Sequence, residues 1–587
     1  MLGQLRQHLL LTVSVFLIFA GGALAWFVQT QAGSIAVHDL RYTSDNGATL
    51  SGLLYVPNAA SSINPAPGVL AVHGYINSRE TQSAYAIELA RRGYVVLAMD
   101  QRGHGYSDPP AFAAGFGGPA GLTWLRSLDI VDTSQVVLTG HSMGGWTVLS
   151  AAAQMPEAYT SVIVSGSSTG TFGVPEGDAI FPRNFGLVFA QYDEFSGSMW
   201  LSETGAGIVE TDKLKTQFGT SETVTPGRLY GSIDAGTARQ LYQPAQTHPA
   251  NHITSAGVAG VLDWVQRTTS TPVYIDPSNQ VWQWKEFGTL LSLIGALVFV
   301  IAVGGTLLRF PLFAELATRP APAAGIRDRS WWLAAAVVVG IPLLTYFPLQ
   351  GWAASIPTSA VFAQNLTNGF MVWAGGVGLI SLALFLIWHF FLGGRAGGGN
   401  LRAYGLGWEG GFSARRLLLA VLLGLLAVLS LYLLLAINQF LFTADFRFWV
   451  IAIKLMSSLQ LQLFLGYLLP FTLFFLVFGI ILHGQMRASD DAPLARAIAI
   501  NACLGGLGIG ILLLYQYGSL FLAGHLAIPA QALLTIVAIQ FVVLLPLTSV
   551  ISTVYFQRTG QVYTGAVVNG LLVTWIIVAG QATHFAF

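Results

Sequence analysis

The sequence of 587 residues has few charged side chains, 9% of the total, against roughly 25% in an ordinary soluble domain. This shortage argues against a purely soluble protein. Without a basic cluster in its polar part, the chain is not expected to bind nucleic acid. The single cysteine, Cys503, excludes an internal disulfide. The motifs G-x-x-x-x-G-K-[ST] and H-E-x-x-H are also missing, so we expect no nucleotide or metal cofactor.

The formal net charge of zero hides two different halves. Residues 1–286 hold 14 Lys+Arg and 21 Asp+Glu, a net charge of −7, whereas residues 287–587 hold 13 and 6, a net charge of +7. The first half is therefore mildly acidic and faces water. The second half is apolar with a sparse excess of arginine, as expected for a domain in a bilayer with arginines on its cytoplasmic side.

Long apolar runs indicate membrane-spanning helices, each of which needs about 20 apolar residues. The first run, 9–28, is long for a signal peptide, so we predict an uncleaved anchor. Eight further runs follow at 288–308, 331–349, 370–392, 417–437, 463–483, 497–517, 532–555 and 563–582. The expected parts are an anchor over 1–33, a polar domain over 34–286 and a membrane domain over 287–587.

The loop arginines predict the orientation, because Lys and Arg in short loops favour the cytoplasmic side. Arg6 precedes the first run, and other arginines cluster in alternate loops, namely Arg309, Arg319, Arg327, Arg329, Arg395, Arg402, Arg415, Arg416, Arg487, Arg496 and Arg558. We therefore expect an integral protein of the plasma membrane with a cytoplasmic N-terminus and an extracytoplasmic domain over 29–286. Segment 446–462, interrupted by Arg447 and Lys454, is expected to form an interfacial helix or part of another span.

The polar domain is predicted to consist of alternating strands and helices. Short apolar or β-branched runs predict strands at 35–41, 48–56, 66–73, 94–100, 135–139, 161–164 and 185–192. Helical patterns lie between and after them at 79–92, 121–128, 144–155 and 255–268. Strands and helices in this order predict an α/β fold with a mostly parallel sheet that helices cover on both faces.

The sharpest motif is GHSMG at 140–144, directly after the strand QVVLT and directly before a helix. The pattern G-x-S-x-G at a strand-to-helix turn needs its glycines because larger side chains would obstruct the turn that presents the serine hydroxyl. The sequence therefore predicts Ser142 as a nucleophile.

With two further motifs, this turn resembles the α/β-hydrolase superfamily over about residues 34–268. His73-Gly74-Tyr75 follows an early strand, as the family's HG-x element does, and DQRGHGYS at 100–107 is similar to its D-x-R-G-H-G-x-S loop. The resemblance implies the α/β-hydrolase fold. It does not select a substrate, because esterases, lipases, peptidases and acyltransferases share these motifs.

The resemblance also implies roles for particular residues. Ser142 would attack an acyl carbon, and the backbone N–H groups of Tyr75 and Met143 would form the oxyanion hole. For the acid we prefer Asp193, at the end of FGLVFAQYDEF, to its neighbour Glu194, since side chains alternate at a strand end. The family order places a histidine after the acid.

Two histidines in THPANHITSAG can serve as the base, His248 and His252. We prefer His252 because it directly precedes the last helix, where the family keeps its base. His248 remains the alternative.

The interval 165–184, where the family often carries a lid, is too short for a large helical cap. The longer insertion lies between Asp193 and His252. Its aromatic residues Trp200, Phe218 and Tyr230 are candidates for an acyl pocket or for ordinary core residues.

These features predict a membrane-bound serine hydrolase that cleaves an ester, or less favourably an amide, through an acyl-enzyme. Its expected partners are a small-molecule or lipid-like ester and the lipid bilayer. One alternative is an acyltransferase with the same triad. Another is a transporter or sensor with a non-catalytic hydrolase-like domain, because eight further spans are more than an anchor requires.

Overall fold

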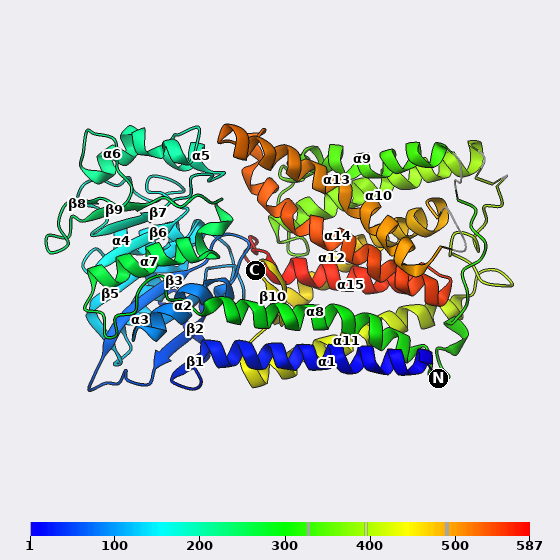
Figure 1. Ribbon diagram of the computed structural model, residues 1–587, viewed down its shortest axis with the longest axis horizontal. Helices are drawn as coiled ribbons and strands as arrows, with labels where there is room; N and C mark the ends of the chain where they lie inside the picture. Colours follow the sequence, from blue (N-terminus) through cyan, green and yellow to red (C-terminus); the bar gives the residue numbers. More distant parts are fainter. Residues whose placement is uncertain (1, 326–328, 393, 396, 488–491) are drawn as a thin grey trace.

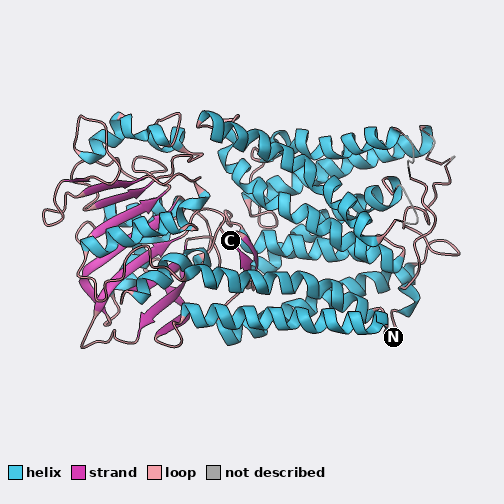
Figure 2. Ribbon diagram, in the orientation of Figure 1, coloured by secondary structure: helices cyan, strands magenta, loops and turns pink. Residues whose placement is uncertain are grey.

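The computed structural model describes residues 2–587 except 326–328, 393, 396 and 488–491. Arg327, one of the arginines that predict the orientation, lies outside the described residues. The strands of the large sheet gather at one end of the molecule and long helices form a bundle at the other (Figures 1 and 2). The chain begins at the far end of the bundle and ends between the two parts.

The first part is built on one sheet of nine strands in the order β1-β2-β4-β3-β5-β6-β7-β9-β8. The strands are β1 (Ile35–Thr43), β2 (Thr49–Pro57), β3 (Ala66–Val72), β4 (Val95–Asp100), β5 (Val131–His141), β6 (Ser161–Ser165), β7 (Phe185–Val188), β8 (Leu229–Tyr230) and β9 (Arg239–Tyr242). From β4 to β9 neighbouring strands are parallel, whereas β1, β2 and β8 pair in antiparallel fashion. This arrangement is the predicted α/β-hydrolase fold.

The side chains of the central strand β3 alternate between two hydrophobic cores. Leu70 and Val72 lie in the core beneath α3 and α4, whereas Val69 and Ala71 lie in the core beneath α2 and α7. The helices are α2 (Ser83–Arg91), α3 (Gly118–Arg126), α4 (Met143–Gln154) and α7 (Ser255–Thr268). Because successive side chains of a strand point to opposite faces, a strand covered on both faces is apolar at every position.

Among the described residues, nine helices are long and apolar enough to cross a membrane. They are α1 (Leu2–Gln29), α8 (Trp282–Leu307), α9 (Ser330–Ala353), α10 (Asn365–Phe391), α11 (Ala414–Phe442), α12 (Ser458–Ile480), α13 (Leu494–Ala523), α14 (Ala532–Thr559) and α15 (Tyr563–Gly580). These helices agree with the nine predicted spans and indicate a membrane protein.

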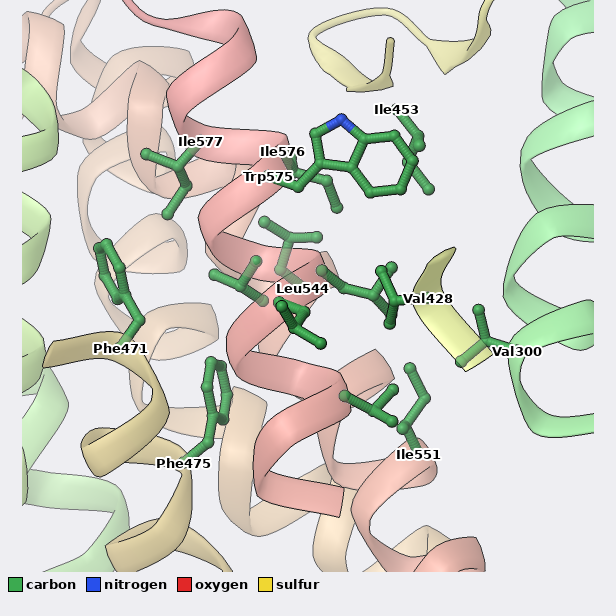
Figure 3. Close-up of a cluster of buried hydrophobic side chains, with 14 of the residues drawn as sticks. Val300, Val428, Ile453, Phe471, Phe475, Leu544, Ile551, Trp575, Ile576 and Ile577 are labelled. Carbon is green, nitrogen blue, oxygen red and sulfur yellow. The ribbon is translucent and has the colours of Figure 1, made fainter. Parts of the chain in front are cut away.

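Helix α15 forms the centre of the bundle. Of its 18 residues, 83% are buried. Figure 3 shows Trp575, Ile576 and Ile577 of this helix among apolar side chains from the helices around it, which include Val300, Val428, Phe471, Phe475 and Leu544. The bundle therefore has an interior of its own and is more than a set of separate anchors.

Helices α1 and α8, which flank the first part in the sequence, lie side by side (Figure 1). Small residues face each other along this contact, and a Cβ added at Gly21 would lie 2.3 Å from the carbonyl oxygen of Gly288. Ser292 donates a hydrogen bond to the carbonyl of Ile18 at 2.8 Å. Close backbone approach through small residues is a common way for membrane helices to associate. The sheet domain is thus held to the bundle by two paired helices.

The segment between α11 and α12 differs from its prediction. Of residues 446–462, the first part forms a short antiparallel hairpin of β10 (Phe446–Phe448) and β11 (Ile451–Ile453) and not an interfacial helix. The last part, 458–462, belongs to the span α12, as the second alternative predicted. Arg447 and Lys454 do not interrupt a membrane helix. Both are buried against acidic residues, Arg447 against Asp445 and Glu80, and Lys454 against Glu80.

Candidate active site

Ser142 lies at a tight turn between the last residue of β5 and the first residue of α4. Its φ of 52° is in the left-handed region that L residues rarely adopt. A Cβ added at Gly140 would lie 2.2 Å from the carbonyl oxygen of Gly144, and one added at Gly144 would lie 2.1 Å from that of Val72. Both glycines of the G-x-S-x-G motif are therefore required by close backbone contacts.

Asp193 lies in the loop after β7, where its carboxylate faces a histidine. Its Oδ2 lies 2.9 Å from Nδ1 of His248 and its Oδ1 lies 3.1 Å from the same nitrogen. The backbone N–H of Phe195 donates to Oδ1 of Asp193 at 2.9 Å and fixes the carboxylate. The structure thus brings Asp193 to His248, and the preference for His252 as the histidine beside the acid is wrong.

His252 is the last residue of the 3-10 turn Pro249–His252, and its ring forms no hydrogen bond to Asp193. Its ring packs on that of His141, with the centroids 4.0 Å apart, and neither ring nitrogen has a hydrogen-bond partner among the described residues. Burial, together with the neighbouring histidines, lowers the pKa of His252 to about 3. A buried neutral imidazole packed in this way has the character of a core residue.

The ring of His248 packs on backbone that is hydrogen-bonded to the Ser142 turn. The backbone N–H of Ser142 donates to the carbonyl of Ser165 at 2.8 Å, and Gly166 follows that residue. A Cβ added at Gly166 would lie 2.9 Å from Nδ1 of His248, so the ring packs directly on this backbone. The Ser142 hydroxyl hydrogen-bonds to no other described residue.

The electrostatics favour a positive charge on His248. Burial alone would lower the pKa of this imidazole, but the carboxylate of Asp193 and then that of Glu194 raise it above its ordinary value. The backbone N–H of His248 donates to Oε2 of Glu194 at 2.7 Å. Burial and the adjacent Asp193 in turn raise the pKa of Glu194 to about 7. Asp193 therefore binds the ring of His248, while Glu194 binds its backbone.

The two expected oxyanion donors also lie at the nucleophile. Met143 is the first residue of α4, so its N–H has no acceptor in a preceding turn of helix. The N–H of Tyr75 donates to no acceptor among the described residues. A Cβ added at Gly74 would lie 3.2 Å from that of Ser142, which shows how closely this loop packs on the nucleophile.

The loop DQRGHGYS is organised by Asp100. Its Oδ1 accepts the backbone N–H of Arg79 at 2.8 Å, and its Oδ2 accepts the N–H of Tyr106 at 3.1 Å and the hydroxyl of Ser51. Gly105 has a φ of +53°, and a Cβ there would collide with this carboxylate. Asp100 thus ties the loop to the segment that follows Tyr75, and its role is structural.

The membrane domain contacts the edge of the sheet where Ser142, Asp193 and Tyr75 lie. From α13, Tyr517 donates its hydroxyl to Oε1 of Glu194 at 2.9 Å. After α15, Nε2 of His584 lies 3.0 Å from the hydroxyl of Tyr75. Ligand sites of open α/β sheets lie at the carboxyl ends of the strands, and here those ends face the bundle (Figure 1). No sequence pattern predicted these partners, which are distant in the chain.

The aromatic residues of the insertion before His248 are largely buried in the domain. Trp200 and Phe218 are 0% and 3% exposed, and the indole N–H of Trp200 donates to the carbonyl of Ser167 at 3.0 Å. The ring of Tyr230 packs edge-on against Phe218. They belong to or pack against the core beneath α3 and α4, which agrees with their reading as core residues. Within the described residues, no group of three or more His, Cys, Asp or Glu is arranged to hold a metal ion.

Comparison with known proteins agrees with this fold. Residues 67–207 match a family model described as alpha/beta hydrolase fold. An uncharacterized protein of Mycobacterium tuberculosis is 32% identical over 99 residues, which are 17% of this chain and 28% of that protein. The uncharacterized hydrolase YugF of Bacillus subtilis is 35% identical over 101 residues, 17% of this chain and 36% of that protein. The sn-1-specific diacylglycerol lipase ABHD11 of Xenopus tropicalis is 32% identical over 115 residues, 18% and 34% of the two chains.

Among solved structures, the dienelactone hydrolase-like promiscuous phosphotriesterase P91 from metagenomic libraries is 16% identical and has a TM-score of 0.29, with 41% of this chain and 99% of that chain covered. This chain spans about a third of the length of the curated relatives it matches. The sheet domain is an α/β-hydrolase domain. The chain therefore combines an α/β-hydrolase fold with a set of helices that are long and apolar enough to cross a membrane.

Proposed function

We propose that the protein is a membrane-bound serine hydrolase that cleaves an ester bond, and less favourably an amide, through an acyl-enzyme. One observation carries this proposal: the carboxylate of Asp193 lies 2.9 Å from Nδ1 of His248. The ring of His248 packs on Gly166, whose neighbour Ser165 accepts the backbone N–H of Ser142. The triad is then Ser142, His248 and Asp193, with His248 in the role first expected of His252.

In the first half of the reaction, Oγ of Ser142 attacks the acyl carbon while Nε2 of His248 takes the hydroxyl proton. The negative charge that develops on the carbonyl oxygen is held by the N–H groups of Tyr75 and Met143. Asp193 stabilises the imidazolium and accepts a hydrogen bond from Nδ1, so that in the neutral ring Nε2 is left free to take a proton. The tetrahedral intermediate collapses, the carbon–oxygen bond to the alcohol breaks, and His248 gives its proton to the leaving alcohol.

In the second half, water attacks the acyl group on Ser142 and His248 takes a proton from that water. The same two N–H groups hold the second oxyanion. When this intermediate collapses, the acyl carbon separates from Oγ, which recovers its proton from His248. The carboxylic acid leaves and the free enzyme is restored.

The position of the site favours a lipid-like ester. The catalytic edge of the sheet faces the membrane domain, and one relative is named as a diacylglycerol lipase. We place the N-terminus in the cytoplasm and the hydrolase domain outside the plasma membrane, because the loops rich in arginine belong on the cytoplasmic side. The functional units in this proposal are the anchor 1–33, the hydrolase domain 34–286 and the membrane domain 287–587.

Labelling with a fluorophosphonate, which reacts with an activated serine, tests the nucleophile directly. The detergent-extracted wild-type protein is expected to label, and Ser142→Ala is expected to lose the label completely because it removes the attacking oxygen. Ser150→Ala is the matched control, since Ser150 lies on α4 about two turns after the nucleophile. Folded wild-type protein that fails to label, or label retained in Ser142→Ala, would contradict the proposal.

A further inference from the structure

Glu194 and Tyr517 are polar residues that lie beside the proposed triad and are not part of it. Glu194 follows the catalytic acid in the hydrolase domain, and Tyr517 lies on the membrane helix α13. Glu194 is 7% exposed. Because burying a carboxylate is unfavourable unless hydrogen bonds satisfy it, the partners of Glu194 indicate what it does.

Each oxygen of the Glu194 carboxylate has one strong donor. Oε2 accepts the backbone N–H of His248 at 2.7 Å, and Oε1 accepts the hydroxyl of Tyr517 at 2.9 Å. The carboxylate thus bridges a membrane helix and the backbone of the proposed catalytic base. Above the Glu194 pKa of about 7 the carboxylate is charged, and hydrogen bonds to a charged group are stronger than neutral ones, so the bridge then restrains both ends.

The backbone of His248 is held from both sides. Its N–H is bound by Glu194, and its carbonyl lies 3.1 Å from Nε2 of His141, the residue before the nucleophile. Its ring is bound separately by Asp193. The position of this imidazole relative to Ser142 therefore depends on Glu194 as well as on the triad acid.

The end of α13 is packed firmly against the same loop. The ring of Phe521 lies 5.4 Å from that of Tyr192, and Phe195 packs against Leu520 and Leu526. A Cβ added at Gly524 would lie 2.7 Å from Thr204 of the hydrolase domain. These contacts fix the end of α13 against the hydrolase domain, so the hydroxyl of Tyr517 is held next to Glu194.

We propose that Tyr517 of the membrane domain is a positioning residue that holds the catalytic histidine in place through the carboxylate of Glu194. This inference rests on the proposed function. It gives the bundle a part in the reaction, because a transmembrane helix supplies one end of the chain of contacts Tyr517–Glu194–His248. The bundle then acts on catalysis as well as anchoring the enzyme.

The bridge also sets the pH dependence of the base. The titratable groups that face His248 are Asp193, Glu194, His141 and His252, and those that face Glu194 are Asp193, His248 and Tyr517. A negative charge on Glu194 raises the pKa of His248, and the donor on Tyr517 favours that negative charge. Removing either the charge or the donor should lower the pKa of His248, so activity should persist to lower pH.

The test compares Tyr517→Phe and Glu194→Gln as full-length proteins, by the rate of fluorophosphonate labelling as a function of pH. Tyr517→Phe keeps the ring and removes the hydroxyl. We expect roughly a tenfold loss of the plateau rate, about the effect of one hydrogen bond to a charged group, with the acid limb moved to lower pH. Glu194→Gln keeps an acceptor for His248 and removes the charge. It should move the acid limb in the same direction with a smaller loss of rate.

The double variant and one control make the result specific. Because both residues act through one bridge, Tyr517→Phe should add little to Glu194→Gln. Tyr515→Phe changes an exposed tyrosine two residues away on the same helix and should behave as wild type. The inference is overturned if Tyr517→Phe matches Tyr515→Phe in rate and pH profile, or if its effect is undiminished in Glu194→Gln. A wild-type protein that does not label would instead overturn the proposed function itself.

Discussion

His248→Gln is expected to lower kcat/KM for a soluble ester by about 10³-fold, within the range of roughly 10²–10⁴ that a general acid–base residue contributes. The variant removes the imidazole that we propose as the acceptor of the Ser142 proton, and it leaves Asp193 without its partner at 2.9 Å. His252→Gln is expected to lower it by less than about tenfold, because neither nitrogen of His252 has a hydrogen-bond partner among the described residues.

Steady-state kinetics on purified full-length protein separate the two histidines. The thermal midpoints of both variants show whether they fold, since each replaces a buried side chain. In the wild type, kcat/KM should decrease as the pH is lowered, and the midpoint of this decrease should lie above about pH 6.5, the ordinary pKa of histidine. The reason is that Asp193 and Glu194 outweigh burial and raise the pKa of His248. Equal losses in the two variants, or a larger loss in His252→Gln, would reject His248 as the base.

The sequence predicted the position of Ser142 but favoured the wrong one of two nearby histidines. The turn that holds Ser142 is recognisable because its residue pattern is confined to five consecutive positions, and Gly140 is required by a contact with Gly144 inside the motif itself. His248 and His252 lie in one loop before α7, and the order of the chain favours the residue nearer the helix. In the structure the ring of His248 faces Asp193, whereas the ring of His252 packs on His141. These contacts join residues that are distant in the chain, and no local pattern records them.

The large sheet and the nine spans were predictable for a similar reason. Apolar runs and alternation report burial, and burial of this kind follows from the residues of one segment. The hairpin of β10 and β11 was not predictable, because Arg447 and Lys454 resemble an interruption of a membrane helix when the sequence is considered alone. Their acidic partner Glu80 lies more than 360 residues away. Ionic contacts at such separations leave no periodic signal.

Glu80 forms ion pairs with residues of both parts of the protein, and we expect its removal to lower the stability strongly. Its carboxylate lies 3.3 Å from Nε of Arg79, 3.4 Å from Arg447 and 3.5 Å from Lys454, and it joins the segment after Tyr75 to the hairpin of the membrane domain. Lys454 is 2% exposed, and Glu80 is its sole ion-pair partner among the described residues. Removing one partner of a buried ion pair costs about 3–5 kcal/mol, because the remaining charge stays buried and unpaired.

Glu80→Ala is therefore expected to destabilise the protein by about 3 kcal/mol and to lower its thermal midpoint in detergent. Lys454→Met should cost less, because Glu80 keeps Arg79 and Arg447 and the new side chain fills the same space. Glu157→Ala is the control for removal of a carboxylate, since its ion pair with Arg183 is exposed and contributes little. Equal thermal midpoints for Glu80→Ala and Glu157→Ala would show that the hairpin does not depend on this carboxylate.

The same carboxylate predicts how stability changes with pH. Burial opposes the charge on Glu80, but Lys454, Arg79 and Arg447 outweigh it and hold its pKa well below the ordinary value. A group whose pKa is lowered by folding stabilises the native state fully above its unfolded-state pKa of about 4.3, and this contribution is lost as the pH falls through the folded-state pKa. The difference in thermal midpoint between wild type and Glu80→Ala should therefore be constant near neutral pH and shrink below about pH 4. A difference that grows with acidification would mean that Glu80 is protonated in the folded protein, and the hairpin would then be held by its neutral contacts alone.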